Sequence, residues 1–321
     1  MIKRLLFLAA CGTLWFVFGA APASADNGPH VAGAGVVADG CAGCHRTHTA
    51  KAANLLKDAQ PGLCYTCHGT SGTGANTDVQ SGVGYSGANR ATAAGALRGG
   101  GFVSARIESA LPTGQVATYS NALGVVPVKA TGVAVSSAHT VDGTSGTAWG
   151  NGPNSVTANT GKAINLSCGS CHDPHGNGNF RILKNVPAQS GGTSTPVADS
   201  LAGVAKVYTT ANYWKVDDGA APAFIANVSG WCTTCHTRYL TPGDGSTPNA
   251  DAVFTYRHKS DGVAQGRASC IQCHVSHGSN AAMSGPASAA GTNNPGATIA
   301  TGSSKLLRID NRGTCQMCHN K

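Results

Sequence analysis

One motif, Cys-x-x-Cys-His, occurs six times in this chain of 321 residues and constrains the fold more than any other feature. The spacing is typical of covalent c-type haem attachment, where two thiols bond to the porphyrin and the adjacent His binds the iron. Zinc sites and disulfides also use Cys-x-x-Cys pairs, but neither explains a His directly after the second Cys in every copy. The motifs predict six haem c groups, held by Cys41, Cys44 and His45; by Cys64, Cys67 and His68; by Cys168, Cys171 and His172; by Cys232, Cys235 and His236; by Cys270, Cys273 and His274; and by Cys315, Cys318 and His319.

The N-terminus predicts export. Two cations precede an apolar run over residues 5–20, and small residues at 23–25 resemble a cleavage site, a pattern typical of a secretory signal peptide. A membrane anchor is the alternative, but this run is shorter than the roughly 20 residues that a span needs. We therefore expect residues 1–25 to be removed, together with Cys11. Residues 26–321 would form one hexahaem domain without a membrane span, outside the cell or in the periplasm.

Six further histidines equal the haems in number, which predicts that every iron binds two imidazoles. Methionine is the other common axial ligand, but only Met283 lies both outside the expected signal peptide and outside an attachment motif. Because an axial Met raises the potential of a haem, this scarcity favours low-potential haems. A surface role is the alternative for an isolated His such as His139. The predicted distal ligands are His30, His48, His139, His175, His258 and His277.

Three of these distal histidines follow a motif His by three residues, giving His45-x-x-His48, His172-x-x-His175 and His274-x-x-His277. On a helical turn such positions share one face, so the second His must ligate a different haem from the first. Two haems held by one turn would lie nearly parallel, about 4 Å apart, which favours rapid electron hopping.

The motifs also bear on catalysis. A multihaem reductase keeps one iron open for substrate, whereas all six motifs here end in His and the remaining His suffice to close every iron. Glu108 is the only Glu, and the Asp residues are scattered, so no acid–base group is evident. We expect an electron carrier and no enzyme; a multihaem reductase is the weaker alternative.

Composition supports a core made of porphyrin. Leu, Ile, Val and Phe make up 17% of the chain, 55 of 321 residues, below the roughly 20% of ordinary globular domains. The expected fold is that of a multihaem cytochrome c: coil-dominated, with short helices at the haem motifs and a few short strands, wrapped around a chain of stacked haems. A helix is predicted over Ala50–Gln60 before Pro61, and strands in Val125–Ser137 and at Phe180/Ile182. The spacing between motifs varies, so no copied haem domains are expected.

Charge argues against a nucleic-acid partner. Residues 26–321 carry 20 Lys and Arg against 14 Asp and Glu, a net +6. Each ferric haem with two imidazoles and two ionised propionates adds about −1, so six of them cancel the excess, and propionates are natural partners for Arg. No basic stripe is present.

The order of motifs resembles the OmcS-type outer-surface hexahaem cytochromes, which polymerise into conducting extracellular filaments. The resemblance covers the order of all six motifs and the positions of the His-x-x-His pairs, whereas the connecting loops are dissimilar. It is carried by Cys41-Ala-Gly-Cys-His-Arg-Thr-His48, Ser167-Cys-Gly-Ser-Cys-His-Asp-Pro-His-Gly176, Trp231-Cys-Thr-Thr-Cys-His-Thr237, Cys270-Ile-Gln-Cys-His-Val-Ser-His-Gly278 and a final motif near the C-terminus.

The resemblance implies a homopolymer that receives electrons from periplasmic or outer-membrane cytochromes and passes them to extracellular acceptors. In it, His48 crosses to a neighbouring subunit and closes the iron bound by His274. The other implied pairs are His30 with His45, His175 with His68, His139 with His172, His258 with His236, and His277 with His319. A monomeric electron shuttle in the periplasm or at the outer surface is the alternative, in which His48 serves its own chain.

The scarcity of apolar side chains generates a first prediction. Expressed without haem attachment, the chain should stay unfolded, because it buries too little apolar surface to offset the entropy of ordering nearly 300 residues. Circular dichroism and limited proteolysis of the haem-free protein would check this. A compact, protease-resistant apoprotein would contradict it.

Overall fold

The computed structural model describes His30 and residues 40–97, 99–105, 133–148, 162–190, 222–236, 270–281 and 306–307. The expected signal peptide, His258 and the Val126/Val128 part of the predicted strand region lie outside the described residues. Within them, no helix is long and apolar enough to cross a membrane.

The sixth attachment motif also lies outside the described residues. The structure therefore does not test the prediction that Cys315, Cys318 and His319 hold a haem, and this part of the haem count rests on the sequence. The other five motifs are described.

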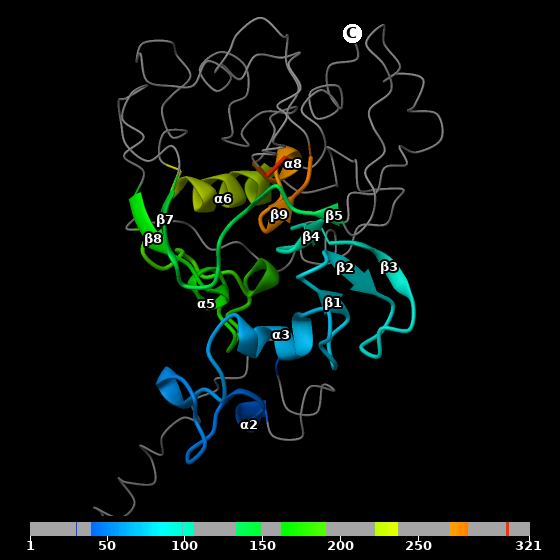
Figure 1. The fold of residues 1–321 in the computed structure, drawn as a ribbon. Helices are drawn as coiled ribbons and strands as arrows, with labels where there is room; N and C mark the ends of the chain where they lie inside the picture. The colour runs from blue at the N-terminus through cyan, green and yellow to red at the C-terminus, as the bar shows by residue number, and fades with distance from the viewer. Residues whose placement is uncertain are drawn as a thin grey trace, which may run out of the picture.

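Four α-helices each contain both cysteines of a described attachment motif, and a fifth, α6, contains the first Cys of its motif, Cys232. A Cys-x-x-Cys spacing suits a single helical turn, because residues three apart lie on the same face and both thiols then point the same way. In Figure 1 the helices follow one another in chain order from α2, near the bottom of the view, through α3 and α5 to α6 and α8. They are α2 (Gly40–Cys44), α3 (Gly62–His68), α5 (Cys168–Cys171), α6 (Pro222–Thr233) and α8 (Cys270–Cys273).

The strands are short and all their pairings are antiparallel. Three of them form a sheet of order β1-β2-β3, and the others pair two by two as β4-β5, β6-β9 and β7-β8. Their bounds are β1 (Thr77–Asp78), β2 (Val83–Tyr85), β3 (Ala93–Ala96), β4 (Ser104–Ala105), β5 (Val133–Ala134), β6 (Ser137–Ala138), β7 (Ser145–Ala148), β8 (Lys162–Asn165) and β9 (Gly278–Ser279).

Buried apolar side chains are few and belong to different elements, among them Leu63 of α3, Val83 of β2, Val228 of α6 and Val275 after α8. Two of the fully buried side chains, Asp78 and Ser279, are polar. Asp78 accepts hydrogen bonds from the amides of residues 80 and 81, both at 3.0 Å. The polypeptide in the described part thus has no large apolar core of its own, in keeping with a coil-dominated cytochrome.

Glycine permits one close crossing of two backbones. Gly100 has a φ of +73° and forms a parallel bridge with Gly278 of β9. A Cβ at Gly100 would collide with the carbonyl oxygen of Gly278. Only glycine suits a position that needs both a left-handed backbone and a bare face, and the crossing brings residues 99–101 beside the fifth attachment motif.

Two predicted elements are wrong. Instead of a helix over residues 50–60, the structure has a three-residue 3-10 turn, Ala53–Leu55, in which Asn54 has a φ of +59°. The segment folds back onto the first motif, where the Leu55 carbonyl accepts from the amide of Arg46 at 2.8 Å. Phe180–Ile182 is likewise a 3-10 turn and no strand. In the Val125–Ser137 region, the strand prediction is confirmed at β5.

Arg90 ties the loop after α3 to that helix. Its guanidinium donates hydrogen bonds to four carbonyl oxygens: those of Cys67 and Gly69 at the end of α3, of Ala75, and of Thr77 in β1. It also lies 5.3 Å from the centre of the Tyr85 ring. A cation at the C-terminal end of a helix interacts favourably with its unpaired carbonyls.

We predict that Arg90→Ala lowers the free energy of unfolding of the haem-loaded protein by about 2–4 kcal/mol, because charged hydrogen bonds to part-buried carbonyls are lost. Denaturant titration followed at the haem absorbance measures the change. Lys51→Ala, which removes an exposed cation, is the matched control and should change little. Equal stability of the two variants would contradict the role given to Arg90.

Candidate haem-binding site

Six of the described histidines share one pattern of hydrogen bonding, in which the ring nitrogen Nδ1 forms a hydrogen bond and Nε2 forms none. In five of them the acceptor is a backbone carbonyl, so Nδ1 must be the donor. The bonds run from His30 to Pro174 (2.8 Å), His45 to Asn54 (2.9 Å), His139 to Ser276 (2.7 Å), His172 to Arg181 (2.9 Å) and His277 to Gly100 (3.1 Å), while His68 bonds to the Thr77 hydroxyl (2.6 Å).

This pattern is the one that metal-bound histidines use. A carbonyl that accepts from Nδ1 fixes the neutral tautomer, orients the ring and leaves an unprotonated Nε2 for a metal. Burial favours the same neutral form: it lowers the pKa of His68 to about 4, with smaller contributions from His30, Arg90 and His172. Burial also lowers the pKa of His139 and His172.

Three pairs of histidine rings face each other at nearly one separation. The ring centres of His30 and His68 lie 6.0 Å apart with the ring planes at 67°, and those of His139 and His236 lie 6.3 Å apart with the planes at 54°. The separation is 6.2 Å for His45 and His175, whose rings are within 9° of parallel. Each pair joins a motif His to one of the predicted distal histidines.

The separation fits an iron between the rings. A ligating imidazole nitrogen lies about 2.0 Å from its metal and the ring centre about 1.1 Å beyond it, so two imidazoles on opposite sides of one iron have centres about 6.2 Å apart. The residues present therefore suit a haem with two axial histidines. Such a haem would supply one-electron redox chemistry, and the chain's own groups would hold and orient its iron.

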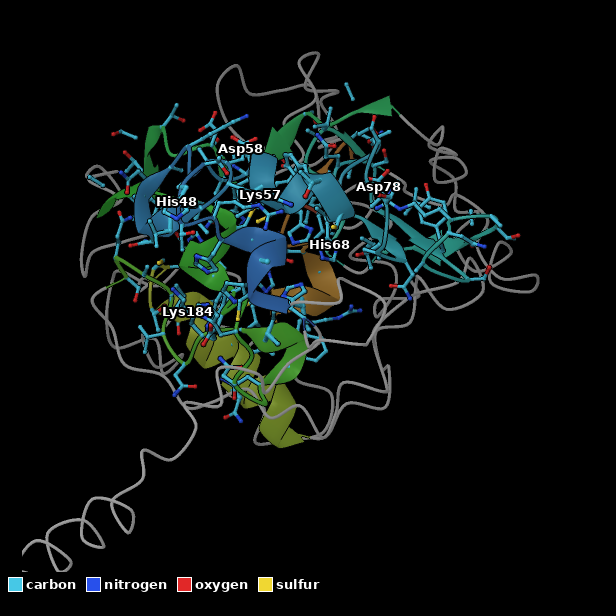
Figure 2. The ribbon with its side chains drawn as sticks, turned by 90° about the horizontal axis from the view of Figure 1, so that it is seen from below. His48, Lys57, Asp58, His68, Asp78 and Lys184 are labelled. Carbon is cyan, nitrogen blue, oxygen red and sulfur yellow. The ribbon has the colours of Figure 1, made fainter. Side chains whose placement is uncertain are left out.

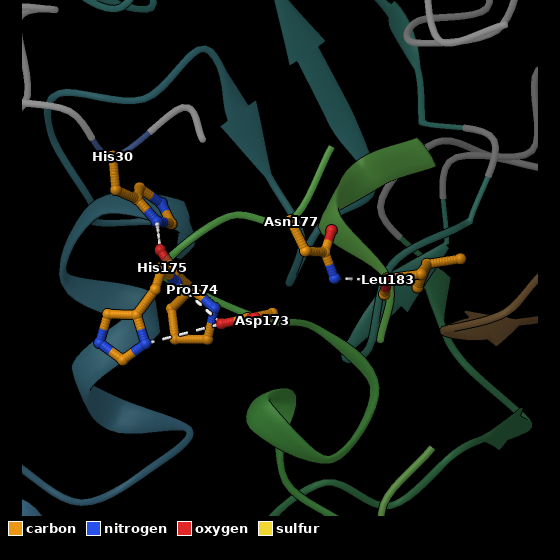
Figure 3. Close-up of polar contacts among 6 residues, drawn as sticks. All are labelled: His30, Asp173, Pro174, His175, Asn177 and Leu183. Carbon is orange, nitrogen blue, oxygen red and sulfur yellow. Dashed lines mark hydrogen bonds and ion pairs between the residues drawn. The ribbon is translucent and has the colours of Figure 1, made fainter. Parts of the chain in front are cut away.

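All three ring pairs differ from those that the resemblance implies. His30 faces His68 and not His45, while His175 faces His45 and not His68. The reason is visible around the third motif, where His30 bonds to the carbonyl of Pro174 and His175 lies 3.6 Å from Asp173 (Figure 3). The Asp-Pro between His172 and His175 thus separates the two ring positions. In the third pair, His139 lies beside His236 and not His172.

The spacing predicted that the His-x-x-His segments form helical turns, and this prediction is wrong. Helix α5 ends at Cys171, and His172 already has extended dihedral angles, φ −106° and ψ 148°. Helices α2 and α8 end at the second Cys in the same way. The consequence drawn from the spacing still holds for the second segment of this kind, because His175 faces the His of another motif.

Thiols of successive motifs lie close together. A hydrogen bond with Cys168 raises the pKa of the Cys64 thiol, and one with Cys270 raises that of Cys232. Burial, followed by Cys235, raises the pKa of Cys171 to about 11. The second and third motifs, the third and fourth, and the fourth and fifth are therefore neighbours in space.

The three His-x-x-His motifs share a copied backbone frame that the sequence analysis missed. In each, a later leucine forms an antiparallel bridge with the motif His: Leu56 with His45, Leu183 with His172 and Leu307 with His274. The carbonyl of the residue before that leucine accepts a hydrogen bond from the amide of the residue after the motif His. The three bonds measure 2.8, 2.7 and 2.8 Å. That residue has a left-handed φ in all three copies: Leu55, Ile182 and Leu306.

A short sequence pattern accompanies this frame. Each copy consists of four residues: a polar or basic residue, then Leu or Ile, then Leu, and last a Lys or Arg. We call these the return segments, and they are Asn54-Leu-Leu-Lys57, Arg181-Ile-Leu-Lys184 and Lys305-Leu-Leu-Arg308. The first and second begin nine residues after their motif His, whereas the third begins 31 residues after it. A search for a fixed period misses the pattern, because only the ends of each loop are copied.

The first two return segments also place a lysine beside the second attachment Cys. The amides of Lys57 and Lys184 donate to the carbonyls of Cys44 and Cys171, both at 2.9 Å. Their side chains lower the pKa of those thiols against the larger effect of burial. Lys57 and Lys184 are labelled in Figure 2.

The Nδ1 bonds generate a third prediction. Thr77→Val removes the hydroxyl that bonds to Nδ1 of His68 and keeps the side chain nearly the same shape. The imidazole then becomes a weaker electron donor to ferric iron, and its affinity for the metal should fall about 10–100-fold. One haem should then become easier to reduce, so its midpoint potential rises in a spectroelectrochemical titration. Thr70→Val is the control, since the Thr70 hydroxyl bonds to Ser81. An unchanged potential in Thr77→Val would show that this bond does not tune the iron.

A family model described as the doubled CXXCH motif matches residues 34–73, which contain the first two attachment motifs. No curated protein and no solved structure matches the chain. The matched residues hold His45 and His68, two of the motif histidines that face a second His. The doubled motif and the ring geometry together indicate a multihaem c-type cytochrome that binds haem covalently and transfers electrons.

Proposed function

We propose that the chain is an exported hexahaem c-type cytochrome that conducts electrons along closely stacked haems, each closed by two histidines. It acts as the subunit of a homopolymeric extracellular filament. Electrons enter from periplasmic or outer-membrane cytochromes and leave to acceptors outside the cell. The observation that carries the haem part is the set of three His ring pairs at 6.0, 6.2 and 6.3 Å, each spanning two segments of the chain.

Paired imidazoles suit electron transfer more than catalysis. An iron with two axial histidines has no site for substrate and changes its ligands little between ferric and ferrous states, so it exchanges electrons readily. Motif helices that follow one another along the molecule (Figure 1) would bring successive haems close together. The neighbouring thiols of Cys64 and Cys168 and of Cys232 and Cys270 favour the same arrangement.

The filament part is supported by His48. It lies exposed in the loop between α2 and the first return segment (Figure 2). Among the residues that the structure describes, no ring contact joins it to another His. It cannot reach the iron of His45, whose second side faces His175. A His of this kind, three residues after a motif His, is free to close an iron of a second subunit, and the proposed iron is that of His274.

Electron microscopy of purified His48→Ala against wild type tests the assembly. We expect wild-type filaments, and in the variant particles of single subunits with one high-spin haem in the ferric spectrum. Thr47→Ala, an exposed neighbour, is the matched control and should still polymerise. Pyridine haemochrome analysis and intact mass should give six haems per chain in all three proteins.

Each outcome is informative. Filaments of His48→Ala with unchanged spectra would exclude an intersubunit role for His48. Monomers of wild type with six low-spin haems would favour the shuttle, in which His48 serves its own chain. A high-spin haem in the resting wild-type protein would favour a reductase, because it would show an iron open to substrate.

A further inference from the structure

Two of the His-x-x-His segments anchor a second distal histidine through their third residue. The Pro174 carbonyl accepts from Nδ1 of His30 at 2.8 Å, and the Ser276 carbonyl, at the equivalent position, accepts from Nδ1 of His139 at 2.7 Å. The two donors lie 144 and 137 residues from their acceptors in the chain. A predicted distal ligand is therefore held in one of two ways: as the last residue of such a segment, or by a hydrogen bond to the residue before it.

The two ways of holding the distal His go with different ring angles. His175, the last residue of its segment, lies within 9° of parallel to His45. The anchored His30 is turned by 67° from the ring of His68 that it faces. The other anchored ring is turned by 54° from its partner. The paired rings are thus parallel in the first case and crossed in the other two.

Asp173 fixes the orientation of His175. Its carboxylate accepts from the amide of His175 at 3.1 Å and lies 3.6 Å from Nδ1 of the ring (Figure 3). Its own amide donates to the carbonyl of Ile182 in the second return segment at 2.7 Å, so its backbone is held as well. Asp173 and Pro174 form one turn that carries the His175 ring and anchors the His30 ring.

The angle between two axial imidazoles decides how they act on an iron. Each ring donates π-electron density to the iron d orbital that lies perpendicular to its plane, so parallel rings raise one d orbital and crossed rings raise two. Parallel rings then give a rhombic ferric spectrum in electron paramagnetic resonance (EPR), whereas crossed rings give one large g value. Parallel rings also favour the ferric form and so lower the midpoint potential, which axial ligands help to set.

We infer that Asp173-Pro174 positions the second axial ligands of two irons in different planes, so that the first two motifs hold electronically distinct haems. The iron between His45 and His175 gives a rhombic spectrum, and the iron between His30 and His68 gives a large g value. The inference rests on the proposed function in that it requires haem at these two motifs. It concerns ligands of one chain, so it holds for a filament and for a monomer alike.

EPR of the haem-loaded ferric wild type and of two single-ligand variants tests the assignment. His175→Gly should remove one haem's intensity from the rhombic signal, turn that haem high-spin and leave the signal with the largest g value intact. His30→Gly is the matched control and should do the reverse, removing one haem's intensity from the signal with the largest g value only. Added imidazole should return both opened irons to low spin.

The opposite pattern would overturn the inference: loss of the large-g signal in His175→Gly, or loss of the rhombic signal in His30→Gly. A wild-type protein whose low-spin haems all share one signal would overturn it too. A protein without haem would instead remove the proposed function, and a protein without filaments would remove the assembly proposal and leave this result untouched.

The positioning role of Asp173 is tested with variants that keep every ligand, which also serve if a Gly variant does not accumulate. Asp173→Ala frees the ring of His175, so one rhombic signal should move to larger g and the midpoint potential of that haem should rise in an EPR-monitored redox titration. Asp173→Asn keeps an oxygen that can accept from the His175 amide and should retain the wild-type g values. Wild-type g values in Asp173→Ala would show that Asp173 does not hold the ring plane.

Discussion

The hydrogen bond from histidine Nδ1 to a backbone carbonyl is the interaction on which this structure depends. It is a weak bond on its own, yet it decides which ring nitrogen keeps the proton and where the other nitrogen points. In His45 and His172 the acceptor is the first residue of a return segment, Asn54 or Arg181. The loop that follows each of these two motifs therefore orients the ring of the motif His, which is the predicted iron ligand. A haem bound there would constrain the path of the loop as well as the ring.

The copied frame explains several features that look unrelated in the sequence. A motif His in extended conformation needs a partner strand, which the bridging leucine supplies. The tight return requires left-handed dihedral angles at Leu55, Ile182 and Leu306, which are unfavourable for such side chains and persist only where the surrounding contacts determine them. The three copies of the frame are alike although the loop between their ends differs in length.

Sequence reasoning predicted what depends on local chemistry. The short helices at Cys-x-x-Cys follow from the need to align two thiols, and the small apolar core follows from composition. The predicted helix over residues 50–60 was wrong because helix propensity was outweighed by the hydrogen bond from the Arg46 amide to the Leu55 carbonyl, which folds the segment back onto the first motif. Ring pairs such as His30 with His68 could not be predicted, because they depend on chain folding over many residues, as the bond from His30 to Pro174 shows.

The geometry also bears on why such a chain is rich in glycine and poor in large apolar side chains. If haems fill the interior, the polypeptide must pass close to itself around flat, rigid groups, and side chains would hold the backbones apart. The crossing of Gly100 over Gly278 shows the requirement directly, since the same residue supplies the carbonyl that anchors His277. A larger residue there would displace the ring of His277, a predicted iron ligand, as well as a loop. Composition, backbone geometry and metal ligation are therefore aspects of one packing problem.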